Sequence, residues 1–246
     1  MFPWVETGFR KSMQPRIVST LRRLGREKRT GVFRTTADTI RREVMLEQGA
    51  IIGALSTAVD ERLGEIMVRR GCITERQLHN ASKLMRAGTR RLGDALVDLR
   101  IVARAEVNVF VRTQLAEIGS KFLTEPVRRL EFFHEATLDR VTENPVPIAD
   151  VIIEAARHGR HGMKADIESL LDSNFRPALT RESMSAVQTL RLETHEAFVL
   201  SRCDGRSNIH DILAQSPLSA EDTARILLGF EQAGIIAMMS IVADGH

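Results

Sequence analysis

Two short arginine motifs offer the clearest candidate chemistry in this chain. Arg62-Leu63-Gly64 recurs as Arg91-Leu92-Gly93, 29 residues later. Each arginine directly precedes a predicted helix, where a cation opposes the helix dipole and gains no local stabilisation. A guanidinium in that position would suit an external carboxylate or phosphate. The same motif also fits plain packing of one helical hairpin on the next, so the residues leave both interpretations open.

The repeat extends beyond these three letters. Each copy predicts a short helix, a tight turn and a longer helix, and Thr74 with Gln77 forms a capping pattern before the longer helix of the first copy. Gly64 and Gly93 allow close approach of a neighbouring backbone. We therefore expect two αα-hairpins that bury one shared core.

Catalytic constellations are missing from the rest of the sequence. There is no phosphate-binding loop, nucleophile elbow or zinc-protease motif. Glu193, His195 and Glu196 lie at a predicted helix start, where acidic side chains favour the helix dipole. We predict that the protein is not an enzyme and requires no cofactor.

Metal and disulfide chemistry are not indicated either. Cys72 and Cys203 lie far apart without a CxxC motif, so we expect two buried core cysteines. His158 and His161 flank a glycine in a predicted loop and have no carboxylate or thiol beside them, which argues against a metal site.

The charge of the chain is unevenly distributed. Residues 1–140 carry 26 Lys/Arg against 17 Asp/Glu, whereas residues 141–246 carry 9 against 15. A basic first half suits an acidic partner, although opposite charges would also help two halves to pack. The chain has 246 residues, 43% of them apolar, and we recognise no signal peptide or membrane span, so we expect a cytoplasmic globular protein.

Periodicity predicts an α+β fold with a small antiparallel sheet. We expect an amphipathic helix first, then a three-stranded meander with a tight turn at Gln48-Gly49, then helices, and finally a strand that rejoins the sheet. The expected ranges are 15–28 for the helix, 31–36, 42–47 and 50–55 for the meander, 60–123 for the inserted helical hairpins and 128–133 for the last strand.

The C-terminal part predicts a mainly α-helical, winged-helix-like domain. We expect helices at 195–203, 209–214 and 220–233, capped by Thr194, Ser207 and Ser219 and ended by Gly205 and Gly234, then a β-prone end. The expected division is a first domain at 13–135, a linker with short helices at 136–177, and the winged-helix-like domain at 178–240.

The first domain resembles the PATAN domain of PatA-type bacterial response regulators. The resemblance covers residues 13–135 and lies in the order of the parts: the helix, a meander ending in LEQGAIIGA, then ERLGEIMVRRGCITERQL, RRLGDALVDL and RLEFF. It implies a non-enzymatic signalling or scaffolding role through docking to a bacterial signalling or motility protein. No receiver domain is present, so phosphorylation control is not implied. The oligomeric state stays open.

The repeat is also similar to the cyclic-di-GMP-binding N-terminal domain of secretion and pilus ATPases. That resemblance implies a nucleotide site at Arg62, Leu63, Gly64, Leu78, Arg91, Leu92, Gly93 and Gln114. This chain departs from the motif, with Ser82, Val107 and Val111 at leucine positions, Arg100 at a glycine position and Met85 at a glutamine position. A missing glutamine would leave one purine edge unpaired. Cyclic-di-GMP binding is therefore the alternative function.

Two further interpretations concern surfaces. For protein docking, the candidate residues are the arginines that we expect on exposed helical positions, namely Arg69, Arg70, Arg86, Arg90 and Arg100. DNA binding through the C-terminal domain is a second alternative. The helix expected to enter the groove carries Glu221, Asp222 and Glu231 against Arg225, a balance that phosphate repels.

Overall fold

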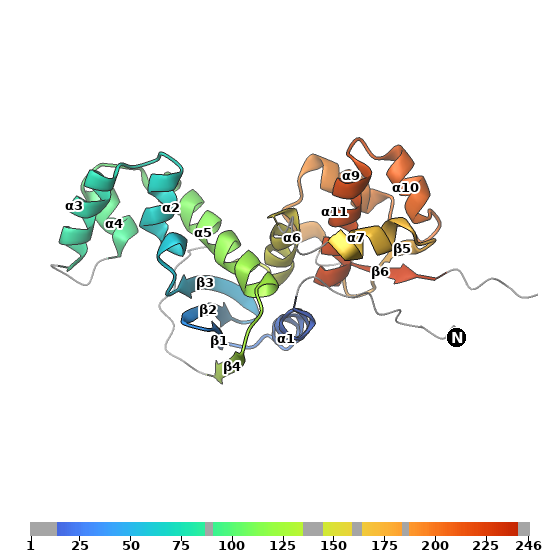
Figure 1. Cartoon of the computed structure of the whole chain (residues 1–246), viewed down its shortest axis with the longest axis horizontal. Helices are drawn as coiled ribbons and strands as arrows, with labels where there is room; N and C mark the ends of the chain where they lie inside the picture. Colours follow the sequence, from blue (N-terminus) through green and yellow to red (C-terminus); the bar gives the residue numbers. More distant parts are fainter. Residues whose placement is uncertain (1–13, 87–90, 135–144, 159–163, 184–186, 241–246) are drawn as a thin grey trace, which may run out of the picture. The chain divides into compact units, whose positions relative to one another are not determined.

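The computed structural model describes residues 14–86, 91–134, 145–158, 164–183 and 187–240 (Figure 1). Its contacts divide the chain into two compact units. The sheet unit consists of the described residues within Arg29–Phe122 and Pro126–Pro145. The helical unit consists of those within Met1–Lys28, Leu123–Glu125 and Val146–His246. The first helix and the described residues within 146–177 group with the C-terminal elements in these contacts. The domain bounds expected from the sequence stay a prediction.

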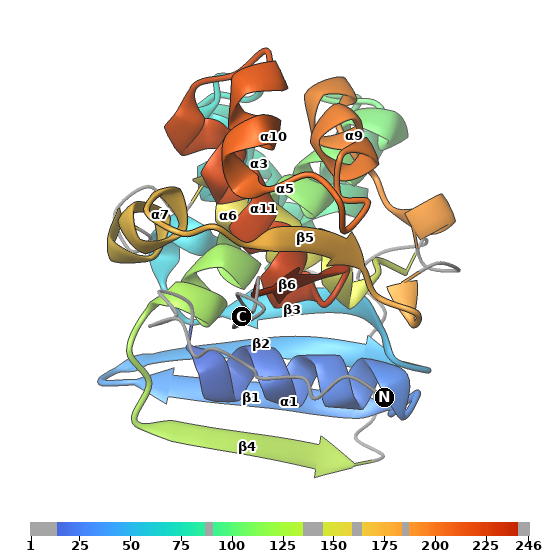
Figure 2. The same cartoon turned by 90° about the vertical axis from the view of Figure 1, so that its right-hand side faces the viewer.

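The sheet unit contains a four-stranded antiparallel sheet in the order β3-β2-β1-β4 (Figure 2). Its strands are β1 (Gly31–Ala37), β2 (Ile40–Glu47), β3 (Ala50–Ser56) and β4 (Arg129–His134). β4 pairs with β1 from Gly31 opposite His134 to Thr36 opposite Arg129. The expected meander and the return of the last strand to the same sheet are therefore confirmed.

The turn between β2 and β3 has two residues. Gln48 and Gly49 both adopt positive φ angles, 50° and 78°. Two successive residues with positive φ give the backbone twist that a two-residue hairpin requires. The tight turn expected at Gln48-Gly49 is confirmed, and it sets β3 beside β2.

Four helices follow β3 in the chain and precede β4. They are α2 (Leu63–Arg69), α3 (Glu75–Arg86), α4 (Leu92–Asp98) and α5 (Arg104–Thr124), and the 3-10 helix η1 (Val59–Glu61) leads into them. One buried cluster joins all four helices through Met67, Ile73, Ala81, Ala95, Leu96, Val102, Val107 and Val111. At the sheet, the ring of Phe122 on α5 packs edge-on against Phe33, with ring centroids 5.3 Å apart.

Among its described residues, the helical unit combines six α-helices, a 3-10 helix and a two-stranded sheet. In chain order they are α1 (Pro15–Arg26), α6 (Ile148–His158), α7 (Lys164–Leu171), β5 (Arg176–Leu179), η2 (Val187–Thr189), α9 (Thr194–Ser201), α10 (Ile209–Gln215), α11 (Ala220–Ala233) and β6 (Ile236–Met239). β5 pairs antiparallel with β6. α6 packs closely on α11, because a Cβ placed at Gly229 would lie 2.8 Å from the Cβ of Ala156.

Three N-terminal helix caps were expected in the C-terminal part. The structure confirms one of them and has a different capping residue at the other two. Ser219 caps α11 by accepting from the N–H of Asp222, and Gly234 ends it with φ 78°, as expected. α9 instead begins after Glu193, whose N–H donates to the carboxylate of Glu196, so Thr194 is already helical.

α10 is capped by Asn208 rather than Ser207. The carboxylate of Asp204 accepts from the N–H of Ser207, which keeps Ser207 in the preceding turn. The side chain of Asn208 then accepts from the N–H of Asp211 at 2.9 Å. No helix within the described ranges is long and apolar enough to cross a membrane.

Arg100 and Gly71 occupy equivalent positions in the two repeats. Substitutions at these positions measure how much a left-handed backbone conformation costs a residue other than glycine. Both have positive φ, 54° for Arg100 and 71° for Gly71, and no atom lies within 4 Å of a Cβ built on Gly71. A left-handed conformation costs a non-glycine residue about 1 kcal/mol or more. We expect Arg100→Gly to raise the free energy of unfolding by about 1 kcal/mol and Gly71→Arg to lower it by a similar amount, measured by urea denaturation. Loss of stability in both variants would contradict this account.

Candidate functional site

The two Arg-Leu-Gly turns have the same backbone geometry. Arg62 precedes α2 with φ −75° and ψ 143°, and Arg91 precedes α4 with φ −78° and ψ 155°. Both arginines are exposed. Within the described residues, the guanidinium of Arg62 takes part in no hydrogen bond or ion pair, whereas Arg91 does have an interaction partner. The two arginines expected to bind an anion therefore differ in their surroundings.

The glycines of the repeat are required for packing. A Cβ on Gly64 would lie 2.3 Å from Cδ1 of Leu78 and 3.0 Å from Cδ2 of Leu92, and a Cβ on Gly93 would lie 2.6 Å from Cγ1 of Val107. Leu78 and Val107 are equivalent residues of the two copies. The first copy thus contacts the second through Gly64 and Leu92. Leu63, Leu78 and Leu92 also pack against the shared helical cluster.

Gln114, the remaining residue of the expected nucleotide set, has a structural contact. Its side-chain amide donates to the backbone carbonyl of Glu61 at 2.9 Å. Glu61 directly precedes Arg62, so this bond anchors the backbone at the start of the first Arg-Leu-Gly turn. A nucleotide would have to compete with that carbonyl for the Gln114 amide.

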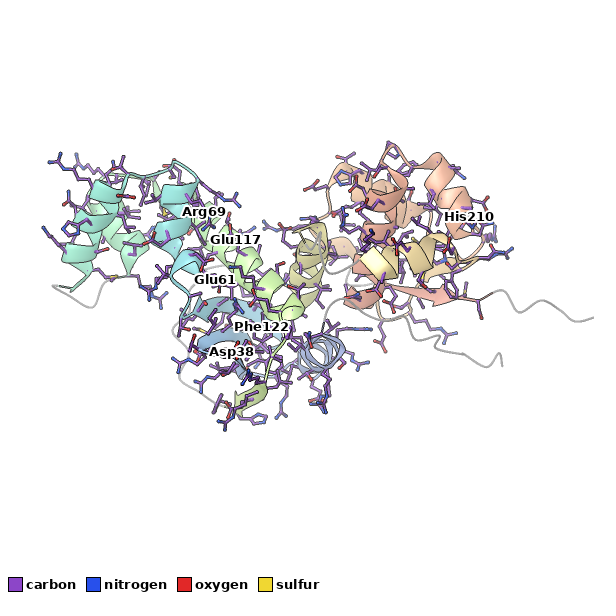
Figure 3. The ribbon with its side chains drawn as sticks, in the orientation of Figure 1. Asp38, Glu61, Arg69, Glu117, Phe122 and His210 are labelled. Carbon is purple, nitrogen blue, oxygen red and sulfur yellow. The ribbon has the colours of Figure 1, made fainter. Side chains whose placement is uncertain are left out.

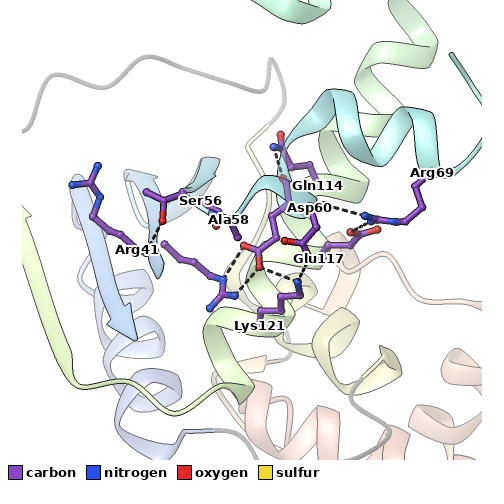
Figure 4. Close-up of polar contacts among 11 residues, drawn as sticks. Arg41, Ser56, Ala58, Asp60, Arg69, Gln114, Glu117 and Lys121 are labelled. Carbon is purple, nitrogen blue, oxygen red and sulfur yellow. Dashed lines mark hydrogen bonds and ion pairs between the residues drawn. The ribbon is translucent and has the colours of Figure 1, made fainter. Parts of the chain in front are cut away.

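A buried ionic network lies beside this turn (Figure 4). Arg42 on β2 donates to both carboxylate oxygens of Glu61, at 2.6 and 2.9 Å. Lys121 on α5 lies 2.9 Å from the carboxylates of both Glu61 and Asp60. The side chains of Arg42 and Glu61 are only 3% and 1% exposed. The network therefore joins the sheet, η1 and α5 at one point.

The network fixes the ionisation of its members. Burial raises the pKa of Glu61, but hydrogen bonds from Arg42, Ser56 and Lys121 favour the ionised carboxylate more strongly, and the pKa is lowered to about 2. For Lys121, burial lowers the pKa, but hydrogen bonds to Asp60 and Glu61 outweigh it and the pKa is raised. Glu61 and Lys121 are therefore both charged at neutral pH.

The arginines expected to bind a partner fall into three groups. Arg69 and Arg70 are about half exposed, but both form ion pairs with Glu117 on α5, at 2.6 and 3.2 Å (Figure 3 labels Arg69 and Glu117). Arg69 also donates to the carbonyl of Asp60. The side chain of Arg86 and all of Arg90 lie outside the described residues. Arg100 is exposed and, among the residues that the structure describes, forms no ion pair.

The structure adds an exposed basic surface on α3 that the sequence motifs did not predict. Arg76, His79 and Lys83 on α3 are exposed and, by helical spacing, lie on one face of that helix. Ala81 on the opposite face is fully buried. Within the described part of the chain, none of the three side chains forms a hydrogen bond or ion pair. We call these residues the α3 basic face. Their helical spacing, with Ala81 on the opposite side, is the sequence pattern that could have predicted this face.

The cysteines and the possible metal ligands are the remaining chemical candidates. Both cysteines are free, and burial raises the pKa of the Cys203 thiol to about 12, so this thiol stays protonated. No three His, Cys, Asp or Glu side chains that could hold a metal ion gather among the described residues. The expected His158 to His161 loop falls on residues 159–163, which lie outside them.

Comparisons with known proteins were made at three levels. The chain matches no family model, no curated protein and no solved structure. The function has therefore to be argued from the geometry of the chain itself.

The depressed pKa of Glu61 predicts a specific loss of stability in acid. Glu61 is ionised above about pH 4.5 in the unfolded chain and above about pH 2 in the folded one, so its stabilising contribution is complete above pH 4.5 and is lost as the pH falls towards 2. The difference corresponds to an upper bound of about 3 kcal/mol. We expect the free energy of unfolding of Glu61→Gln to fall less than that of the wild type between pH 5 and 2.5.

The control for this experiment is Asp38→Asn. Asp38 pairs with Arg128 at 2.8 Å, but both side chains are about three quarters exposed or more, and exposed ion pairs contribute little to stability. Asp38→Asn should keep the acid dependence of the wild type. Identical curves for the wild type and Glu61→Gln would contradict the proposed ionisation of the network.

Proposed function

We propose that this chain is a non-enzymatic bacterial signalling or scaffolding protein that docks an acidic protein partner through the α3 basic face. The observation that carries the proposal is a contrast among the cations of the sheet unit. Arg34, Arg42, Arg69, Arg70 and Lys121 all bind carboxylates of the same unit. Arg76 and Lys83 on α3 are exposed and, among the described residues, have no such partner.

Unpaired cations on a rigid surface favour binding to an acidic partner. They attract opposite charge over roughly 10 Å at moderate ionic strength, and they do not first have to break an internal ion pair. The rigid support is the helical cluster that fixes α3 against α4. The resemblance of residues 13–135 to the PATAN domain supports the same proposal, with a signalling or motility protein as the partner.

DNA binding through α11 is a weaker proposal. Arg225 is the basic side chain of this helix, and it is only 9% exposed and paired with Glu221 and Asp222 at 2.6 and 2.7 Å. A phosphate group would meet the two carboxylates rather than a free guanidinium. β5 precedes α9, α10 and α11 in the chain, β6 follows them, and the two strands pair with each other. On this basis a winged-helix-like fold stays a proposal for this unit.

Cyclic-di-GMP binding is retained as a second candidate because of one observation. Arg62 is exposed and unpaired within the described chain, and the backbone of Arg91 has the same conformation one repeat later. The contact of Gly64 with Leu92 brings the two turns next to each other. Against it, five of the eight expected residues serve packing and the Gln114 amide is bound to Glu61.

The docking proposal predicts that charge reversal on α3 abolishes capture of the partner. In pull-downs from the native cell, we expect Arg76→Glu with Lys83→Glu to reduce recovery of the partner at least tenfold, and we expect recovery by the wild type to fall as salt is raised. The melting temperature should change by no more than a few degrees, because both positions are exposed and have no ion pair with any described residue.

The matched control is Arg16→Glu with Arg23→Glu on α1. These arginines are also exposed, have the same seven-residue spacing and give the same change in net charge. The control should retain the partner. Equal loss in both double variants, or full retention by the α3 variant, would overturn the assignment of the α3 basic face.

The nucleotide candidate makes a separate prediction in calorimetric titration. If cyclic-di-GMP is bound, Arg62→Ala and Arg91→Ala should each weaken binding by roughly 1.5 to 3 kcal/mol, because each removes a charge-assisted hydrogen bond. Arg76→Ala should leave the affinity unchanged. Absence of heat at high micromolar nucleotide would eliminate this candidate and leave packing as the role of the repeat.

A further inference from the structure

A cleft of about 290 Å³ lies within the helical unit, between α6, the start of α9 and the first half of α11 (Figure 1). Its apolar walls come from Ile153, Ala156, Leu218 and Ile226. The volume is at the lower end of the roughly 300–1,000 Å³ of small-molecule sites. The cleft therefore suits a small molecule with a short aliphatic part.

The two arginines that line the cleft are already bonded to carboxylates. Arg157 donates to both oxygens of Glu196, at 2.6 and 2.5 Å. Arg225 donates to Asp222 at 2.7 Å and to Glu221 at 2.6 Å. An anionic ligand would have to displace these carboxylates before it could reach a guanidinium, so the cleft does not select an anion.

The carboxylates of the lining are no more available to a cation. Both oxygens of Glu196 are bonded to arginine, and those of Asp222 accept from Arg225 and from the hydroxyl of Ser219, at 2.7 Å each. The side chain of Glu193 is 56% exposed, so water screens its charge. These three carboxylates exceed the two guanidiniums by one negative charge, and the N-terminal ends of α9 and α11 offset it by roughly half a charge each. The lining therefore favours an uncharged ligand.

One hydrogen-bonding group of the lining has no partner within the described chain. It is the Nε–H of Arg225, which is buried in a side chain that is only 9% exposed. Buried donors are nearly always bonded in folded proteins. The missing group is thus an acceptor, and a carbonyl oxygen supplies one without adding a charge.

We propose that this cleft binds a small uncharged molecule that carries a carbonyl oxygen on a short aliphatic chain, such as an aliphatic amide. The chain packs against the apolar walls, and the carbonyl oxygen accepts from the Nε–H of Arg225. Because this nitrogen is buried, a small rotation of the Arg225 side chain accompanies binding. The site does not involve α3, so it does not depend on the function proposed above.

Three probes of nearly equal size test the charge preference on the full chain. They are pentanamide, pentanoate and pentylammonium, and binding is followed by the backbone amide chemical shifts of His195 and Gly229, which line the cleft. We expect saturable shifts for pentanamide, with a Kd on the order of millimolar. Each ion should bind at least about fivefold more weakly, because it loses water without gaining a free partner. Equal binding of either ion, or shifts that do not saturate with pentanamide, would overturn the proposal.

A lysine substitution tests the hydrogen bond to the carbonyl oxygen. Arg225→Lys removes the Nε–H but keeps a cation for Glu221 and Asp222, and it should weaken binding of pentanamide at least about fivefold. The matched control is Arg202→Lys, at an exposed arginine of the same unit that does not line the cleft, and it should bind like the wild type. Unchanged affinity in Arg225→Lys would show that the donor is not used and would contradict the proposal.

A pair of tryptophan variants locates the site without touching the ionic groups. Ile226→Trp fills the cleft from its half-buried wall and should abolish saturable binding of pentanamide. Leu179→Trp makes a similar change at an exposed residue of β5 that does not line the cleft, and it should retain binding. Retained binding in Ile226→Trp would show that the probe binds elsewhere.

Discussion

The ion pair between Arg42 and Glu61 is the constraint on which the arrangement of the sheet unit depends. It joins the central strand β2 to the residue that directly precedes the first Arg-Leu-Gly turn, and Lys121 and Gln114 hold the same residue from α5. Removing two charges from water costs several kcal/mol each, so the pair is stable only while its geometry is kept. The orientation of the helical insert on the sheet is thereby tied to one buried carboxylate.

The two repeats share one packing contact but differ in the residues that follow it. In both, a glycine lets the short helix approach the branched side chain that follows 14 residues later, Leu78 for Gly64 and Val107 for Gly93. The second copy then diverges, because its Gln114 is bound to Glu61 and its turn carries Arg100 in place of glycine. In both copies the glycine is thus required by the close packing of the short helix.

Much of the sheet unit follows from local sequence, and much of the site does not. The meander, the Gln48-Gly49 turn and the Thr74–Gln77 cap depend on neighbouring residues, and all three are present as expected. The partners of Arg69 and Arg70 could not be predicted, because Glu117 lies 48 and 47 residues further along the chain. The caps at Glu193 and Asn208 differ from the expected residues by one position, because the path of the preceding turn decides which side chain reaches the helix.

A double-mutant cycle on Arg42→Met and Glu61→Met tests the central claim most directly. Each single variant leaves one buried charge without its main partner and should lower the free energy of unfolding by about 3 to 5 kcal/mol. The double variant replaces the pair with apolar side chains and should lose less than the sum of the two, with a coupling of at least about 1 kcal/mol. Additive losses would show that the two residues act independently and that the pair does not hold the insert to the sheet.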